Sequence, residues 1–209
     1  MQSKYIVVID YGMGNLGSIA NMLKYLGASA VISSDKEVIE KADKLILPGV
    51  GHFDRAIQNI HKLDLFNLIQ YKALDQQTPI MGICLGMQLM CNASEEGIDK
   101  GLGLVDADVI KFNFKKEQNL KVPHMGWNKV ELAKSESLIT NGLTQDARFY
   151  FVHSYFVTCN NNSDILTSSH YGHKFVSSFE KNNIVGVQFH PEKSHKFGIT
   201  LFRNFIENF

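Results

Sequence analysis

The chain has 209 residues, of which 44% are hydrophobic and 20% are charged, and its formal net charge is zero. This composition is typical of a globular domain, and balanced charge without a Lys/Arg block gives no basis for binding nucleic acid or an acidic membrane. The sequence contains no apolar run of the roughly 20 residues that a membrane span requires, and no signal-peptide pattern at its start.

The first half of the chain alternates apolar runs with segments of helical spacing. The apolar runs have the composition of strands buried on both faces of a parallel sheet: residues 5–10, 31–33, 45–47 and 79–82. Helical spacing is found in the segments between and after them: residues 16–26, 35–41, 56–74 and a run from Gly86. This alternation predicts an α/β fold with a doubly wound, mostly parallel sheet flanked by helices. Its active site is expected at the carboxyl ends of the strands.

A glycine-rich turn, Gly12-x-Gly14-x-x-Gly17, follows the first strand and could be interpreted as a dinucleotide-binding loop. That interpretation requires an acidic residue at the end of the next strand, where Asp35 is the nearest candidate. The motif alone is weak evidence. We expect no nucleotide and no other cofactor.

The second half is rich in β-branched and aromatic residues. Short strand-like segments are joined by Asn/Gly turns: residues 104–114, 149–158, 165–170, 174–180 and 184–189. They predict a smaller antiparallel sheet beside the first, and an amphipathic helix over 197–209 closes the chain. We find no internal repeat and no long linker, so residues 1–209 are expected to form a single domain.

The junction after the fourth apolar run has the sequence Gly82-Ile-Cys84-Leu-Gly86. Gly-x-Cys-x-Gly is the nucleophile-elbow pattern with cysteine in place of serine, and its small residues avoid a collision within the tight turn. The turn places the Cys84 sulfur at the start of a helix, where the thiolate is favoured over the thiol. The alternative is a buried cysteine in an ordinary strand-to-helix turn.

A histidine and a carboxylate follow the last apolar strand in the sequence His190-Pro191-Glu192. Proline keeps His190 extended, so the His190 and Glu192 side chains can point to the same side. A carboxylate beside an imidazole fixes its tautomer and stabilises its charged form. With Cys84, these residues would form a nucleophile, a base and an orienting group.

The remaining cysteines and histidines do not indicate a metal site. Cys84, Cys91 and Cys159 have no C-x-x-C spacing, which argues against a disulfide framework or a zinc site and favours a reducing cytoplasm. His170-x-x-His173 is interpreted as a strand-end pair, and the remaining isolated histidines are expected at the surface: His52, His61 and His195.

These motifs together resemble the class I (triad) glutamine amidotransferases. Five further motifs are similar to those of the glutaminase subunits of imidazole glycerol phosphate synthases: Asp10-Tyr-Gly-Met-Gly-Asn15, Pro48-Gly-Val-Gly51, Pro123-His-Met-Gly-Trp-Asn128, His153-Ser-Tyr155 and His190-Pro-Glu-Lys-Ser194. The resemblance extends from the first strand to the last helix without a large insertion.

The resemblance implies that Cys84, His190 and Glu192 are catalytic and release ammonia from glutamine through a glutamyl thioester. The backbone N–H of Leu85, with that of Val50 or Gly51, would form the oxyanion hole. Three further residues would hold the α-groups of glutamine: Gln88, Ser154 and Tyr155.

The resemblance also implies a heterodimer with a (β/α)₈-barrel cyclase that receives the ammonia in histidine biosynthesis. Four residues are expected at that interface: Asn15, His124, Met125 and Trp127. A core position for Trp127 is an alternative. For the whole chain, the alternatives are a glutaminase serving a paralogous cyclase-like partner, for example in surface-sugar modification, a stand-alone cysteine hydrolase, and a non-catalytic regulator.

Overall fold

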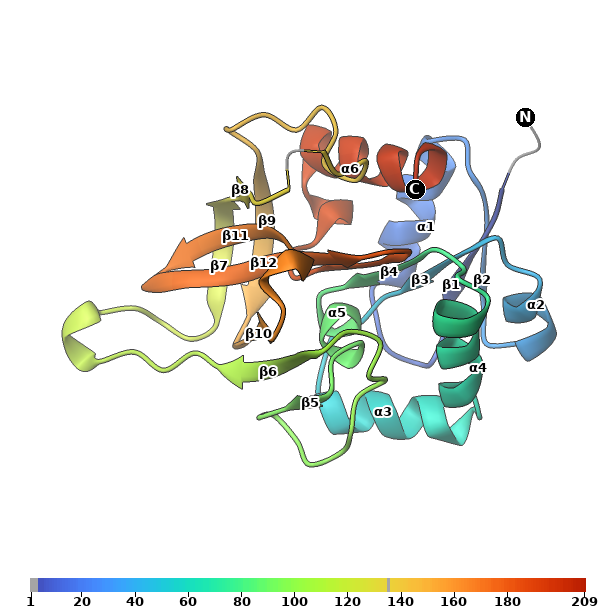
Figure 1. Ribbon diagram of the computed structural model, residues 1–209, viewed down its shortest axis with the longest axis horizontal. Helices are drawn as coiled ribbons and strands as arrows, with labels where there is room; N and C mark the ends of the chain where they lie inside the picture. Colours follow the sequence, from blue (N-terminus) through green and yellow to red (C-terminus); the bar gives the residue numbers. More distant parts are fainter. Residues whose placement is uncertain (1–3, 135) are drawn as a thin grey trace.

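A mixed sheet of eleven strands runs through the centre of the computed structural model, which describes residues 4–134 and 136–209 (Figure 1). Along its main path the strand order is β2-β1-β3-β4-β13-β12-β10-β6-β5, while β11 pairs with β12 and β8. The strands of this sheet are β1 (Tyr5–Ile9), β2 (Ser29–Ser33), β3 (Lys44–Leu47), β4 (Ile80–Ile83), β5 (Ala93–Ser94), β6 (Ala107–Lys111), β8 (Glu131–Leu132), β10 (Tyr155–Cys159), β11 (Ile165–Tyr171), β12 (His173–Lys181) and β13 (Ile184–Val187).

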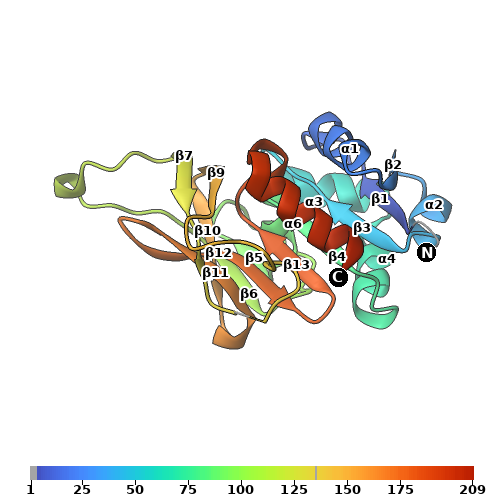
Figure 2. The same ribbon diagram turned by 90° about the horizontal axis from the view of Figure 1, so that it is seen from above.

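Helices cover both faces of the parallel part of the sheet. They are α1 (Leu16–Tyr25), α2 (Lys36–Glu40), α3 (Phe53–Lys62), α4 (Phe66–Gln70), α5 (Leu85–Leu89) and α6 (His195–Glu207). Helices α1 and α6 lie on one face, and α3, α4 and α5 lie on the other (Figures 1 and 2). Alternate residues of β1 accordingly enter two separate cores: Val7 and Ile9 pack on the α3 side, while Ile6 and Val8 pack on the α1 side.

Strand β13 joins the parallel and antiparallel parts of the sheet. It is parallel to β4, with Val187 opposite Ile83, and antiparallel to β12. A separate two-stranded antiparallel sheet is formed by β7 (His124–Lys129) and β9 (Arg148–His153). The predicted fold class is confirmed, with the refinement that most of the antiparallel strands extend the main sheet and only β7 and β9 form the separate one.

The helix predicted over residues 56–74 is interrupted in the structure. Helix α3 ends at Lys62, α4 begins at Phe66, and a π-helical turn follows over Tyr71–Asp75. Between α3 and α4, Asp64 has a φ of +55°, a left-handed conformation that no continuous helix contains. This turn brings Leu65 into the core with no exposed surface.

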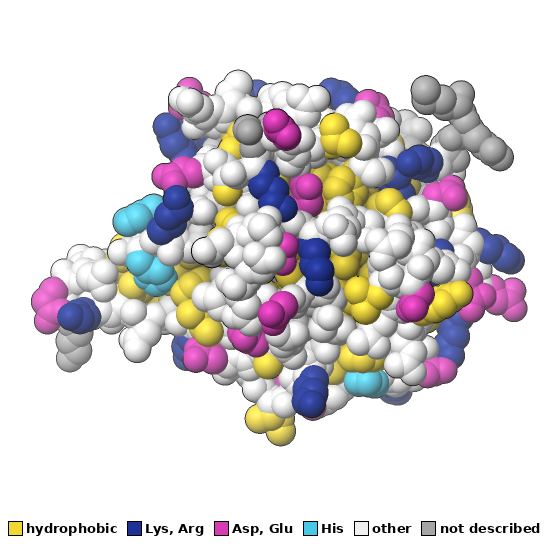
Figure 3. All heavy atoms as spheres, viewed as in Figure 1, with side chains coloured by type: hydrophobic (Ala, Val, Ile, Leu, Met, Phe, Trp, Pro, Cys, Tyr) yellow, Lys and Arg dark blue, Asp and Glu magenta, His cyan; other side chains and the backbone are white. Residues whose placement is uncertain are grey.

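The surface shows no segregation of charge on the face seen in Figure 3, where acidic and basic side chains are interspersed. The segment between β6 and β7 extends away from the rest of the molecule in both ribbon views (Figures 1 and 2). Within residues 4–134 and 136–209, every helix is too short or too polar to cross a bilayer.

Candidate active site

Cys84 lies in a sharp turn between β4 and α5. Its φ of +55° and ψ of −110° are unusual for a residue with a side chain, and such strain is typical of a nucleophile elbow. The flanking glycines allow this turn because a Cβ on Gly86 would lie 1.8 Å from the Leu47 carbonyl oxygen, and one on Gly82 would lie 2.7 Å from the Gly86 carbonyl oxygen. The predicted collision within the turn is therefore confirmed for Gly82, whereas Gly86 is required by its contact with the end of β3.

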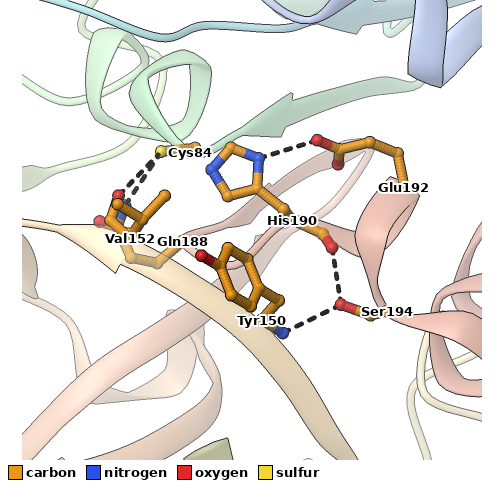
Figure 4. Close-up of polar contacts among 7 residues, drawn as sticks. All are labelled: Cys84, Tyr150, Val152, Gln188, His190, Glu192 and Ser194. Carbon is orange, nitrogen blue, oxygen red and sulfur yellow. Dashed lines mark hydrogen bonds and ion pairs between the residues drawn. The ribbon is translucent and has the colours of Figure 1, made fainter. Parts of the chain in front are cut away.

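The sheet topology brings His190 to Cys84. Strands β4 and β13 are adjacent and parallel, and the Cys84 N–H donates to the Val187 carbonyl at 2.8 Å. Beyond β13, the His190 N–H donates to the Tyr150 carbonyl at 2.9 Å. The buried Ser194 hydroxyl donates to the His190 carbonyl at 2.6 Å and accepts from the Tyr150 N–H at 3.0 Å, which fixes the backbone of His190 (Figure 4).

The His190 ring lies between Cys84 and Glu192 (Figure 4). Its Nδ1 is 2.8 Å from Glu192 Oε1, and the two side chains are only 2% and 1% exposed. Burial by itself lowers the pKa of His190, but the neighbouring Cys84 sulfur and Glu192 carboxylate outweigh it and raise the pKa to about 10. The imidazole can therefore hold a proton taken from the thiol.

The other imidazole nitrogen is available for proton transfer. Among the described residues, His190 Nε2 is buried without a hydrogen-bond partner. With Nδ1 fixed by Glu192, Nε2 can take a proton from a nucleophile and return it to a leaving group.

The Pro48–Gly51 segment lies against the elbow, as the strand topology predicts. A Cβ on Gly49 would lie 2.7 Å from the Gly86 nitrogen and 2.8 Å from Leu85 Cβ. The buried Tyr11 hydroxyl donates to the Pro48 carbonyl at 2.5 Å and thereby anchors the start of this segment. The assignment of oxyanion donors to Leu85 and to Val50 or Gly51 stays a prediction.

Two of the three residues predicted to bind glutamine are in direct contact. Gln88 Nε2 donates to the Tyr155 carbonyl at 3.2 Å and to Gln188 Oε1 at 2.9 Å, so both of its N–H groups are used. The predicted role of Gln88 in binding glutamine would therefore fall to its carbonyl oxygen. The Ser154 carbonyl accepts from the Phe112 N–H at 3.0 Å, which places Ser154 at the junction of β9 and β10.

Buried imidazoles connect β7 to the Tyr155 carbonyl. His153 Nδ1 lies 2.8 Å from that carbonyl and must donate to it, so His153 Nε2 accepts from His124 Nδ1 at 2.9 Å. Burial lowers the pKa of His153 to about 3 and the pKa of His124 to about 4, so both rings are neutral at physiological pH. In a neutral imidazole one nitrogen donates and the other accepts, which is what these consecutive hydrogen bonds require.

The residues predicted at the partner interface differ in exposure. Met125 and Trp127 on β7 are 62% and 48% exposed, and Trp127 stacks on His195 with ring centroids 5.4 Å apart. The core alternative for Trp127 is therefore wrong. Asn15 is partly exposed at the N-cap of α1. His124 is only 4% exposed, so its side chain is committed to His153 and does not present a contact surface, contrary to the expectation from its motif.

The remaining histidines and cysteines are arranged as follows. His52, His61 and His195 are exposed, as predicted. The three cysteines are free. Within the described part of the chain, no three His, Cys, Asp or Glu side chains are grouped as metal ligands.

Comparison with known proteins identifies the family. A family model described as glutamine amidotransferase class-I matches residues 7–209. The chain belongs to the class-I glutamine amidotransferase family. Similar relatives are the imidazole glycerol phosphate synthase subunits HisH 2 of Methanococcus maripaludis, 51% identical, and of Pseudomonas aeruginosa, 48% identical; each match covers 97% of this chain and 98% of the relative.

Solved structures agree with this fold. A crystal structure of a glutamine amidotransferase has a TM-score of 0.71 at 19% identity, covering 96% of this chain and 97% of that one. A glutamine amidotransferase from Thermotoga maritima has a TM-score of 0.66 at 18% identity, covering 92% of this chain and 77% of that one.

Several residues of this amidotransferase site were not assigned a role from the sequence. Ser194 and Tyr11 hold the backbones of His190 and Pro48, and His153 holds the Tyr155 carbonyl. Gln188 contacts the Cys84 sulfur. Tyr11, His153 and Ser194 lie within motifs shared with the family. Gln188 precedes His190 by two residues, and residues so spaced on an extended chain share a face.

Proposed function

We propose that this amidotransferase hydrolyses glutamine to glutamate and ammonia at Cys84 and passes the ammonia to a separate synthase chain. The observation that carries this proposal is the buried arrangement of Cys84, His190 and Glu192 at the ends of adjacent parallel strands. Relatives 51% and 48% identical to this chain are named as subunits of a synthase, which supports placing the acceptor chemistry on a separate chain.

The chemistry follows from the positions of the three side chains. His190 takes the thiol proton, and the Cys84 thiolate attacks the side-chain amide carbon of glutamine. His190 then gives that proton to the amide nitrogen, the C–N bond breaks, and ammonia leaves a glutamyl thioester on Cys84. Water, deprotonated by the same imidazole, hydrolyses the thioester to glutamate and restores the thiol. Glu192 stabilises the imidazolium at each stage.

Backbone and amide groups around the elbow would hold the substrate. The N–H of Leu85, with that of Val50 or Gly51, would bind the oxyanion, and the close packing of Gly49 on Gly86 supports this assignment. The free carbonyl oxygen of Gln88 would accept from the α-amino group. The backbone of Ser154 and Tyr155 would receive the α-carboxylate.

We assign the chain to imidazole glycerol phosphate synthase, as a cytoplasmic glutaminase subunit in a heterodimer with a (β/α)₈-barrel cyclase of histidine biosynthesis. The near full-length identity to two HisH subunits supports this assignment. The exposed Met125 and Trp127 on β7, with Asn15, would contact the cyclase. A paralogous cyclase-like partner is the alternative that the test separates.

The test is to purify the chain with its co-purifying partner and to measure glutamine hydrolysis and imidazole glycerol phosphate formation. Cys84→Ala is expected to abolish both glutamine-driven reactions, while the complex still uses added ammonium salts. Retained glutamine hydrolysis in Cys84→Ala would refute the triad. An active glutaminase complex that makes no imidazole glycerol phosphate would favour the paralogous partner, and a full rate without any partner would favour a stand-alone hydrolase.

A further inference from the structure

A buried glutamine approaches the nucleophile from the strand that carries His190. Gln188 follows β13 directly, has no exposed surface, and places Nε2 at 3.8 Å from Cys84 Sγ (Figure 4). Its backbone N–H is bonded to the Ser177 carbonyl at 2.9 Å, so the position of the residue is set by the sheet.

Neighbouring groups fix which end of the Gln188 amide faces the sulfur. The Tyr155 carbonyl can only accept, so the Gln88 atom that contacts it must be the NH₂ group. The same NH₂ group lies 2.9 Å from Gln188, where it requires an acceptor, and this atom must be Oε1. The opposite end of the Gln188 amide, which faces Cys84, is therefore a donor.

The other surroundings of the Cys84 sulfur give a thiolate little support, so the Gln188 donor matters. The Val152 carbonyl lies 4.0 Å from Cys84 Sγ and, as an acceptor, favours a thiol over a thiolate. Helix α5 contains only five residues, so its dipole is small and does less for the thiolate than the sequence suggests. The Gln188 amide supplies a neutral donor to the sulfur.

We propose that Gln188 donates a hydrogen bond to the Cys84 thiolate, stabilising and orienting the nucleophile, and that Gln88 and the Tyr155 carbonyl lock the Gln188 amide in the donating orientation. The inference requires Cys84 to be the nucleophile of the proposed function, and it is independent of the identity of the partner.

The test measures the rate of Cys84 alkylation by iodoacetamide against pH, in the full chain with Cys159→Ser as background. That background removes the partly exposed thiol of Cys159. Burial raises the pKa of this thiol to about 12. Gln188→Met keeps the length of the side chain but lacks the donor, and it is expected to move the alkylation midpoint upward by about one pH unit, a tenfold loss of thiolate below the midpoint. Gln188→Glu places an acceptor toward the sulfur and is expected to shift the midpoint further.

Two controls separate donation from packing. Ser177→Ala alters a buried hydroxyl beside Gln188 that pairs with Thr167, and it is expected to leave the midpoint unchanged. Gln88→Met removes the lock but leaves the Gln188 amide in place, so its shift is expected to be smaller than that of Gln188→Met.

The decisive outcomes do not depend on activity. A midpoint in Gln188→Met equal to that of the parent chain would overturn the proposal, even if glutamine hydrolysis fell. An equal or larger shift in Gln88→Met would overturn the locked orientation. If Gln188→Glu does not fold, Gln188→Met decides. Glutamine hydrolysis by Cys84→Ala tests the proposed function separately.

Discussion

At the scale of the residue, the site depends on keeping a charged imidazole stable away from water. His190 and Glu192 are almost fully buried, and desolvation alone would make the imidazole neutral. The carboxylate at 2.8 Å and the sulfur on the other side reverse that preference. Because proton binding at His190 is linked to folding, the triad has a measurable effect on stability.

We predict that the free energy of unfolding falls from pH 7 to pH 10 because of His190. The folded chain binds a proton that the unfolded chain releases between its ordinary pKa of 6.5 and the raised value of about 10. The contribution is therefore fully present below the lower value and is lost as pH rises through the higher one. Urea unfolding at a series of pH values should show this decline.

Glu192→Gln provides the comparison, because it keeps the size of the side chain and removes the charge. Its stability should be lower at pH 7 and should vary less with pH, so that the two curves converge near pH 10. Parallel curves for the two proteins would contradict the assigned charge of His190.

At the scale of the element, the elbow depends on two close backbone contacts, one at Gly82 and one at Gly86, that leave no room for a Cβ. The absent Cβ of Gly86 would lie 1.8 Å from the Leu47 carbonyl, a backbone atom at the carboxyl end of β3 that no rotamer change can move. Helix α5 can therefore lie directly on the end of β3, and this contact sets the position of Cys84 relative to Pro48–Gly51.

We predict that Gly86→Ala destabilises the chain by about 3 kcal/mol or more, because the overlap can be relieved only by moving backbone. Gly17→Ala is the matched control: Gly17 lies in α1, and an added Cβ would have nothing within 4 Å beyond the adjoining backbone of its own helix. That change should be neutral or stabilise by about 0.5 kcal/mol through helix propensity. Thermal and urea unfolding of both variants check the pair, and equal stabilities would contradict the packing argument.

Some of these strands and helices could be predicted from the sequence, and others could not. The apolar runs 5–10 and 79–82 identified buried parallel strands, because a strand covered on both faces has few polar residues. The break between α3 and α4 was missed, since Asp64 in a left-handed conformation leaves the apolar spacing on either side intact. Strand β7 was missed because His-Met-Gly-Trp-Asn has no clear alternation.

The triad could be predicted from the sequence and the contacts of Gln188 could not. Gly-x-Cys-x-Gly and His-Pro-Glu are local patterns whose geometry follows from a few adjacent residues. The pairing of Gln88 with Gln188 joins residues 100 positions apart and depends on the β4–β13 register. His124 was expected at the partner interface from its motif, whereas its buried position depends on His153, which is distant in the sequence.

At the scale of the whole molecule, the face that carries β7 is physically connected to the active site. Trp127 and Met125 are exposed on β7, and the buried His124 on the same strand reaches the Tyr155 carbonyl through His153. The Tyr155 carbonyl also accepts from Gln88. A partner bound to β7 would therefore contact the strand that is linked through His153 to Tyr155 and Gln88, the residues proposed to bind glutamine.

We predict that Trp127→Ala weakens binding of the cyclase by at least about 30-fold, corresponding to about 2 kcal/mol for a central aromatic anchor. The stacking of Trp127 on His195 holds the indole in one orientation before binding, which favours such a role. Tyr71→Ala removes a similarly exposed aromatic residue at the α4 end of the molecule and should leave binding unchanged. Titration calorimetry of the two variants checks this, and equal affinities would place the interface elsewhere.

We predict that activation by the partner depends on the conformation of Gly51. Its φ of +111° is available to glycine but not to proline, and Tyr11 anchors the preceding Pro48 carbonyl. The Pro48 carbonyl is therefore fixed, and any rotation lies in the peptide units that follow it. If the partner favours the rotation that completes the oxyanion hole, the free chain is a poor glutaminase and the complex gains about 10²–10³ in rate.

Gly51→Pro removes one N–H and excludes the observed backbone conformation, so the complex should form but should lose most of that gain. Ammonium-driven synthesis by the same complex is the control, because it requires a docked partner and no oxyanion hole. The measurement is the steady-state rate of glutamine hydrolysis. It is made on the free chain and on the complex, with and without an acceptor analogue. Full activation in Gly51→Pro would exclude both the Gly51 N–H and this rotation, and the second oxyanion donor would then have to come from Val50 in the observed conformation.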